Sequence, residues 1–173
     1  EAEFPAELFV ESFDRAHQAG MRSVPHAGET AGPASIWTAL DRLHANRIGH
    51  GIHCIENSEV VQMLYRRNIA LEVCPTSNFQ TGAVLGLTAH PLNDLFGLRL
   101  KVTINTDDPS VSDTTLTDEY LVAVRAIGLQ KRLIFRALRN AIESAFIPDE
   151  ERDGLRTLFQ KALADYPEAP REF

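Results

Sequence analysis

Four strand-like runs in this chain each end in a short polar or glycine-rich segment, and a helical pattern follows each one. The four segments are residues 26–29 (HAGE), 47–51 (RIGHG), 74–78 (CPTSN) and 106–109 (TDDP). Strands that alternate with helices are typical of βα units and a parallel sheet. Polar residues at the carboxyl end of several such strands are typical of a barrel whose chemistry lies at that face. The pattern therefore predicts an α/β fold built from four parallel strands.

The length of the chain limits how much of a barrel it can form. A complete (β/α)8 TIM barrel needs about 250 residues, whereas this chain has 173 and four clear βα units. We therefore expect residues 1–173 to form one domain, the C-terminal half of a TIM barrel without its N-terminal strands. The chain starts at Glu1 without an initiator Met, and we interpret it as the interior of a longer protein.

Element boundaries follow from apolar spacing, caps and breakers. We expect strands at 21–25, 47–50, 69–74 and 100–105. Helices are expected to start at Pro5, Pro33, Asn57 or Ser58, the Ala89–Pro91 segment and a Thr117 cap, and to cover about 133–145 and 155–163. In the second helix, Ile36, Trp37 and Leu40 have the spacing of a buried stripe.

An incomplete barrel leaves two strand edges unpaired, which favours self-association. We expect Val73, Val102 and Ile104 to face the barrel interior and to lack partners from the missing strands. We therefore expect the chain alone to associate through its open edges and to be inactive.

Composition excludes several classes of partner. The formal net charge of −7 and pI near 5.3 argue against a nucleic-acid or anionic-membrane surface. No apolar stretch is long enough to span a membrane. Cys54 and Cys74 form no C-x-x-C pair, which is typical of a reduced cytoplasmic enzyme.

The segment at residues 26–29 carries an H-x-x-E pair at a strand end. His26 could bind a metal, Glu29 could act as a general acid or base, and Gly28 permits a sharp turn. The alternative is a plain glycine turn with a solvated Glu. His50 lies between two glycines that let other groups approach closely, and its alternative is a hydrogen-bonded core histidine.

The segment at residues 106–109 places two carboxylates after an apolar strand. Buried adjacent carboxylates are unfavourable unless something compensates them, so Asp107 could bind a divalent cation and Asp108 a ligand donor. The alternative is a capping Asp before Pro109. Ser77 and Asn78 could add hydroxyl and amide groups, or lie in an ordinary polar loop. We assign no role to the other histidines, which are His17, His44, His53 and His90.

Together, HAGETAGP, RIGHG, LEVCPTSN and INTDDPS closely resemble the bacterial-type adenosine deaminases of the metal-dependent hydrolase superfamily. The resemblance runs over nearly the whole chain in the same order. It implies a (β/α)8 barrel with one Zn²⁺ that deaminates adenosine or 2′-deoxyadenosine to inosine or 2′-deoxyinosine, releasing ammonia, in purine salvage. The implied partner is a small purine nucleoside, with no nucleic acid or membrane.

The resemblance also implies a role for each matching residue. His26 and Asp107 correspond to zinc ligands, and Glu29 to the acid that protonates purine N1. His50 corresponds to the group that orients or deprotonates the attacking water. Three further matches are implied to contact or support the substrate: Asp108 through purine N7, Ser77 by supporting Glu29, and Gly28.

The chain departs from this family in one respect. The family carries an H-x-H pair of zinc ligands on its first strand, and no H-x-H occurs here. One alternative is therefore an inactive remnant that serves as a binding or assembly module. Another is a deaminase for adenine or aminodeoxyfutalosine, although Gly49 and Thr76 favour a nucleoside over adenine or AMP.

Overall fold

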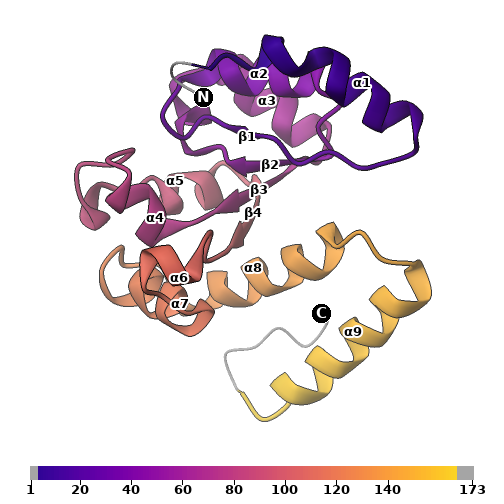
Figure 1. Cartoon of the computed structure of the whole chain (residues 1–173). Coiled ribbons are helices and arrows are strands. Elements are labelled where there is room, and N and C mark those ends of the chain that lie inside the picture. Colours follow the sequence, from indigo (N-terminus) through magenta and orange to yellow (C-terminus); the bar gives the residue numbers. More distant parts are fainter. Residues whose placement is uncertain (1–3, 167–173) are drawn as a thin grey trace.

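The computed structural model describes residues 4–166, in which four short strands form one parallel sheet. The strands are β1 (His26–Ala27), β2 (Arg47–His50), β3 (Ala70–Val73) and β4 (Lys101–Ile104). They lie in sequential order, with Ala27 opposite His50, Ile48 opposite Leu71 and Leu71 opposite Val102. This confirms the predicted α/β architecture of four parallel strands that alternate with helices (Figure 1).

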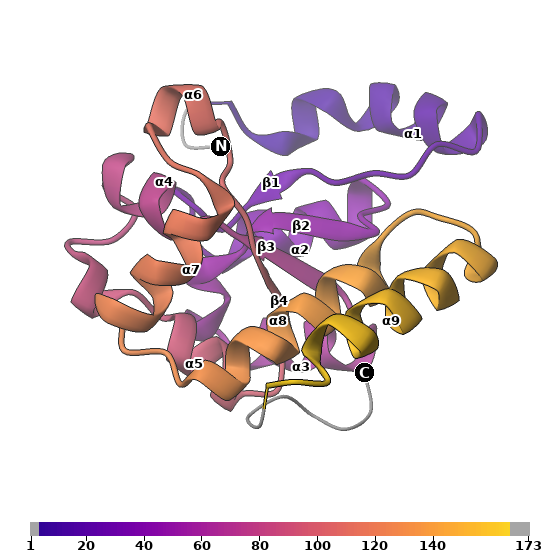
Figure 2. The same cartoon turned by 90° about the horizontal axis from the view of Figure 1, so that it is seen from below.

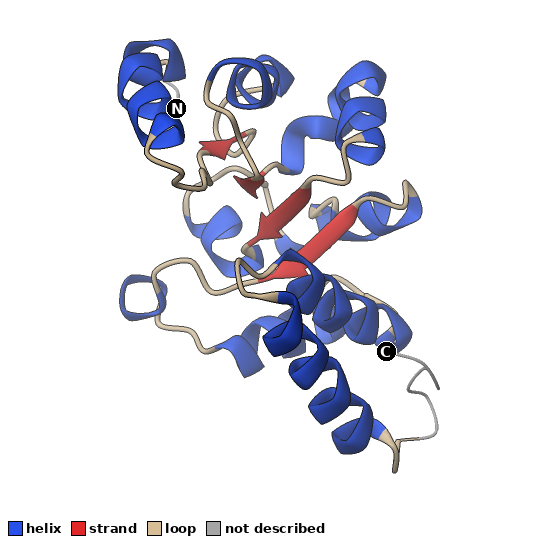
Figure 3. Cartoon of the chain, turned by 90° about the vertical axis from the view of Figure 1, so that its right-hand side faces the viewer, coloured by secondary structure: helices blue, strands red, loops and turns tan. Residues whose placement is uncertain are grey.

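Helices surround the strands, which lie at the centre (Figure 3). The α-helices are α1 (Val10–Gln18), α2 (Pro33–Arg42), α3 (Ser58–Arg66), α4 (Pro75–Gln80), α5 (Leu92–Gly97), α6 (Pro109–Ser112), α7 (Leu116–Arg125), α8 (Lys131–Ser144) and α9 (Asp149–Leu163), and the 3₁₀ helices are η1 (Ala6–Phe9), η2 (Ile52–Glu56) and η3 (Leu87–Ala89). Helix α2 packs on β1 and α8 on β4, while α9 packs on the outside of α8 (Figure 2). No helix among residues 4–166 is long and apolar enough to cross a membrane.

Local capping explains where several helices begin. Asn57 caps α3, as predicted, because its side chain accepts hydrogen bonds from the N–H groups of Glu59 and Val60. The predicted cap at Thr117 is wrong. Thr115 caps α7 instead, since its hydroxyl and the carboxylate of Asp118 form a reciprocal capping box.

The first strand differs from its prediction at 21–25. Only His26–Ala27 forms a strand, and Ser23 makes an isolated bridge to Ala45. The carbonyls of Ser23 and Pro25 accept from the N–H groups of Asn46 and Gly49, but the Ser23 N–H donates to the Asn46 side chain and Pro25 has no N–H, so no regular ladder forms. Residues 74–78 are also not a loop. Pro75 starts helix α4 there, at a first-turn position that tolerates its missing N–H.

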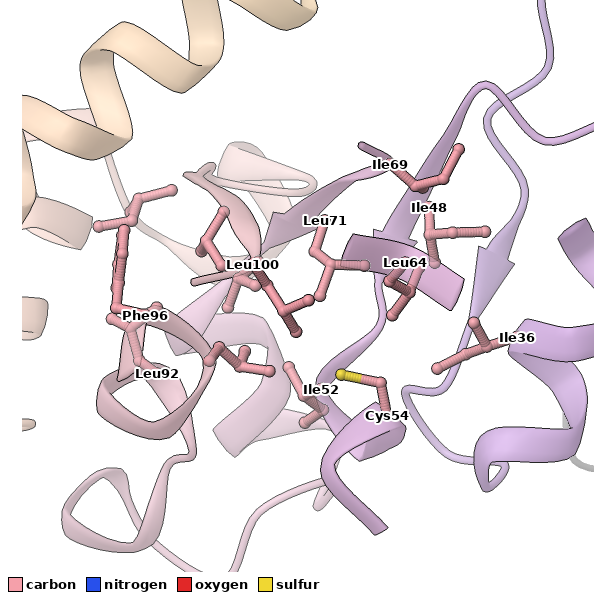
Figure 4. Packing of buried hydrophobic residues seen from close by; sticks show 14 of the residues in the cluster. Ile36, Ile48, Ile52, Cys54, Leu64, Ile69, Leu71, Leu92, Phe96 and Leu100 are labelled. Carbon is pink, nitrogen blue, oxygen red and sulfur yellow. The ribbon is translucent and has the colours of Figure 1, made fainter. Parts of the chain in front are cut away.

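The apolar core lies between the strands and the surrounding helices (Figure 4). Val73, Val102 and Ile104 are at most 3 % exposed and share this core with helix residues such as Leu64 and Leu95. The expectation that they lack partners is therefore wrong. Side chains alternate along a strand, and Glu72 and Thr103 occupy the opposite face. Trp37 is also outside the core, at 44 % exposed, although Ile36 and Leu40 are buried as predicted.

Candidate active site

The four chemical segments meet at the carboxyl ends of the strands. His26 lies in β1, with Gly28 and Glu29 just after it. His50 ends β2, Ser77 and Asn78 lie in the helix that follows β3, and Asp107 and Asp108 follow β4. Because parallel strands end at one edge of a sheet, four separate stretches of sequence contribute to one small region.

His50 lies at the centre of this region and is 1 % exposed. Its Nε2 atom is 3.4 Å from Glu29 Oε2 and 3.9 Å from Asp107 Oδ2. The ring of His26 stands edge-on to the ring of His50, with 4.6 Å between the centroids. Potential ligand atoms of His26, Glu29 and His50 all lie within 4.8 Å of one another, as do those of His50, Cys74 and Asp107.

Tight backbone geometry makes this convergence possible. His50 and Asp107 have positive φ angles of 62° and 58°, which turn the chain sharply as β2 and β4 end. Gly28 has φ 68°, and a Cβ there would lie 2.4 Å from Ile36 Cδ1. At Gly49 a Cβ would lie 2.4 Å from the His26 ring, so the absence of a side chain lets His26 lie against β2.

Helix α4 connects the acidic residues of the site. Ser77 Oγ donates to Asp107 Oδ2 at 2.7 Å, so the expectation that Ser77 supports Glu29 is wrong. Glu29 Oε1 instead accepts from Asn78 Nδ2 at 3.2 Å and from Thr81 Oγ1 at 3.1 Å. Successive residues of a helix point about 100° apart, which directs Ser77 and Asn78 toward different carboxylates.

Two predicted substrate-binding residues have other roles in the local structure. The Gly28 N–H donates to Ser35 Oγ and its carbonyl accepts from the His53 N–H, so its contact with substrate stays a prediction. Asp108 is exposed and lies at the N-terminus of α6. It belongs to neither cluster of ligand atoms found among residues 4–166, and its contact with substrate stays a prediction.

A buried carboxylate, that of Glu119, anchors the first turn of helix α4. The sequence patterns did not indicate this role. Glu119 of α7 is 0 % exposed and accepts from the Thr76 N–H at 3.0 Å and from Thr114 Oγ1 at 2.8 Å. The first turn of α4 has no side-chain cap of its own at Cys74. Glu119 therefore satisfies an N–H of the first turn of α4 and fixes the helix that carries Ser77 and Asn78.

The titratable groups next to the site differ in chemical character. Burial, together with the nearby carboxylates of Asp107 and Glu119, raises the pKa of the Cys74 thiol far above its ordinary value. Burial likewise raises the pKa of Cys54 to about 12. Because the thiolate is the reactive form of cysteine, neither residue is suited to nucleophilic catalysis.

The donor set fits a divalent metal ion. His50 is shared by two clusters of potential ligand atoms, one with His26 and Glu29 and the other with Cys74 and Asp107. Nitrogen and oxygen donors of this kind bind Zn²⁺ in catalytic sites, which usually take three protein ligands and leave one position open.

Fold and site together define an α/β protein of parallel strands and helices with a candidate metal site at the carboxyl ends of its strands. The sequence model of a family described as adenosine deaminase matches residues 1–162, and the chain belongs to this family. Adenosine deaminases from Yersinia pseudotuberculosis and Escherichia coli are each 44 % identical to it over 153 residues. These matches cover 88 % of the chain but 46 % of each relative, so the chain spans about half their length.

Solved structures agree on the fold. Adenine deaminase from Arthrobacter aurescens superposes with a TM-score of 0.90 at 34 % identity, covering 95 % of this chain and 50 % of that one. A zinc-bound amidohydrolase from Burkholderia ambifaria gives a TM-score of 0.85 at 27 % identity, covering 92 % and 45 %. Arabidopsis ADAL in complex with IMP gives 0.79 at 32 %, covering 91 % and 46 %. These neighbours have TIM-barrel folds, and this chain covers 45–50 % of each, so it corresponds to about half of such a barrel.

Proposed function

We propose that this chain forms one side of the active site of a zinc-dependent adenosine deaminase. The reaction converts adenosine or 2′-deoxyadenosine and water into inosine or 2′-deoxyinosine and ammonia, a step of purine salvage. The observation that carries the proposal is the convergence of His26, Glu29, His50 and Asp107 at one end of the sheet. Membership of the adenosine deaminase family supports it.

The proposed roles follow the chemistry of the ring. His26 and Asp107 would hold the zinc ion, which when bound lowers the pKa of a coordinated water toward about 7. Glu29 delivers a proton to purine N1 while the water oxygen bonds to C6. One proton of the water passes to N6, the C6–N6 bond breaks and ammonia leaves, while the remaining hydroxyl proton returns to Glu29 as the C6 carbonyl forms. His50 orients or deprotonates the water, and Asp108 contacts purine N7.

The hydrogen bonds around Glu29 and Asp107 support this division of roles. Asn78 and Thr81 hold one oxygen of Glu29, and the other oxygen faces His50. A carboxyl group held at one oxygen can present the other to a substrate in a constant direction, which general acid catalysis requires. Ser77 donates to Asp107 Oδ2, the same oxygen that lies 3.9 Å from His50 Nε2, as expected for a group that orients a metal ligand.

His26 and Asp107 provide two protein ligands, fewer than the three typical of catalytic zinc. We propose that the remaining ligands come from an H-x-H pair in the part of the barrel that this chain does not include. The complete site would then match the family to which the chain belongs. Activity would depend on both halves, present in one chain or as two.

The test is a substrate comparison with the intact protein loaded with Zn²⁺. We expect adenosine and 2′-deoxyadenosine to be deaminated with higher kcat/KM than adenine, AMP or aminodeoxyfutalosine. A preference for adenine would support the alternative that the Arthrobacter neighbour suggests by its name. Zinc binding without turnover of any of these would contradict the proposal and favour a binding module.

A further inference from the structure

His90 lies behind the candidate active site. It is 5 % exposed and directly precedes the turn into α5. Its Nδ1 accepts a hydrogen bond from the Leu92 N–H at 3.1 Å, and its Nε2 lies 3.3 Å from Asn78 Oδ1. Since Nδ1 is an acceptor, a neutral His90 carries its hydrogen on Nε2 and donates it to Asn78.

His90 stays neutral over the pH range in which most enzymes work. Burial lowers its pKa from 6.5 to about 4. A protonated ring would place an Nδ1–H group against the Leu92 N–H, two donors facing each other. The backbone of α5 therefore selects one tautomer of His90.

The amide of Asn78 is oriented from both sides. On one side, His90 Nε2–H requires an oxygen, Oδ1, as its acceptor. On the other, Glu29 Oε1 lies 3.2 Å from the second amide atom, which must be the nitrogen because two oxygens would repel each other. The two constraints are independent, and they give the same orientation.

This orientation determines the tautomer of His50. Asn78 Nδ2 has two hydrogens; one is directed to Glu29 Oε1 and the other to His50 Nδ1, 3.0 Å away. Nδ1 of His50 is therefore an acceptor, and a neutral His50 carries its hydrogen on Nε2. That atom faces Glu29 Oε2, of the proposed acid, and Asp107 Oδ2, of a proposed metal ligand.

We propose that His90 is a positioning residue which, acting through Asn78, holds His50 in the Nε2–H tautomer. A neutral His50 then offers a donor to the reaction centre, so it orients the attacking water and does not remove its proton. The tautomer itself follows from the contacts within this chain. Its consequence for the water rests on the proposed function.

The direct test is ¹⁵N NMR of the histidine rings in the intact protein near neutral pH, without substrate. We expect an Nδ1 without hydrogen and an Nε2 with hydrogen for His50. Asn78→Asp replaces the amide donor by a carboxylate, which should draw the hydrogen of His50 to Nδ1. A hydrogen on Nδ1 in the unmodified protein would overturn the proposal, whether or not adenosine is a substrate.

His90 is tested by a pair of variants. His90→Leu removes the donor to Asn78 and should allow both His50 tautomers, with kcat lower by about 10–100-fold, as for other residues that orient a site group. His90→Gln keeps an N–H donor and should restore both the tautomer and most of kcat. His17→Gln, an exposed histidine on α1, is the control.

Each outcome of this pair bears on the proposal. Zinc content and circular dichroism identify variants that fail to fold, and the Asn78→Asp spectrum remains informative in that case. If folded His90→Leu keeps the His50 tautomer, His90 does not act through Asn78 and the proposal is wrong. If kcat falls equally in folded His90→Leu and His90→Gln, a purely structural role replaces the positioning role.

Discussion

The two ends of the sheet are built on opposite electrostatic principles. At the amino end, cations lie against anions or aromatic rings: Arg47 is 2.9 Å from Glu72 and its guanidinium lies 3.9 Å above the Phe146 ring. At the carboxyl end, Glu29 and Asp107 both face His50, and neutral Ser77, Asn78 and Thr81 hold them in place.

This difference separates stability from chemistry. Paired charges at the amino end lower the electrostatic energy of the folded chain by themselves. Two carboxylates around one imidazole reach their lowest electrostatic energy only when a cation or a proton-accepting substrate is bound. Such an arrangement is typical of functional sites. Substitutions of Glu29 and Asp107 should therefore change turnover and metal binding, whereas substitution of Arg47 should change stability.

The largest effect should come from Glu29→Gln in the intact protein. The amide keeps the shape of the side chain but cannot protonate N1, so kcat should fall by about 10²–10⁴-fold, or about 3–5 kcal/mol. Zinc content should be unchanged. Glu59→Gln, an exposed residue in the first turn of α3, is the matched control. Turnover of Glu29→Gln close to that of the control would exclude Glu29 as the acid.

The adjacent aspartates should separate metal binding from substrate recognition. Loss of a group that only orients a ligand lowers metal affinity about 10–100-fold. Asp107→Ala removes a proposed ligand itself, so its metal affinity should fall at least as much. Asp108→Ala should keep the metal and raise KM for adenosine. Metal analysis of both purified variants decides between these roles, and equal zinc loss would remove the distinction.

His90 should make stability depend on pH at the carboxyl end. Because burial lowers its pKa to about 4 from 6.5, the unfolded chain binds a proton first as the pH falls. Stability is therefore lost between pH 6.5 and about 4, by up to about 3 kcal/mol. Denaturant unfolding across this range should show a smaller loss for His90→Gln. Parallel curves for the two proteins would contradict a buried neutral His90.

Arg47→Ala should act at the amino end. It removes an ion pair, a ring contact and a hydrogen bond to the Ser144 carbonyl. We expect the free energy of unfolding to fall by about 2 kcal/mol, with kcat per folded molecule unchanged. A large loss of kcat with normal stability would show that the amino end contributes to the chemistry.

Glu143→Gln should have the smallest effect. Glu143 pairs with Arg156 at 2.7 Å, and this hydrogen bond lowers its pKa. Both side chains are partly exposed, so the stability change should be about 0.2–1 kcal/mol. The contribution should be present above the unfolded pKa of Glu143 and disappear as the pH falls through its lowered folded value. Thermal unfolding at pH 7 and at low pH measures both.

Sequence patterns identified the elements because local chemistry determines them. Strands β3 and β4 are short, largely apolar runs, and Asn57 caps α3 through the N–H groups of its own neighbours. The same patterns showed that polar residues follow each strand. Parallel strands then bring His26, His50 and Asp107 to one edge without any further information.

These sequence patterns do not predict contacts between segments that lie far apart in the chain. Glu29 meets Asn78 across 49 positions, and Thr76 meets Glu119 across 43. The expected partner of Ser77 was the wrong carboxylate, since the choice depends on how α4 is rotated over the sheet. The prediction for Val73 failed because periodicity shows that a strand has two faces without showing which of them the helices cover.

The sequence by itself therefore determined the α/β class, the parallel order and the set of groups at the carboxyl end, because each depends on residues close together in the chain. Tertiary structure alone decided the hydrogen bonds that orient those groups: Ser77 to Asp107, Asn78 to Glu29 and His50, and His90 to Asn78. The physical reason is that a hydrogen bond needs atoms about 3 Å apart in a fixed direction. Only the packing of helices on strands sets distances between segments that finely.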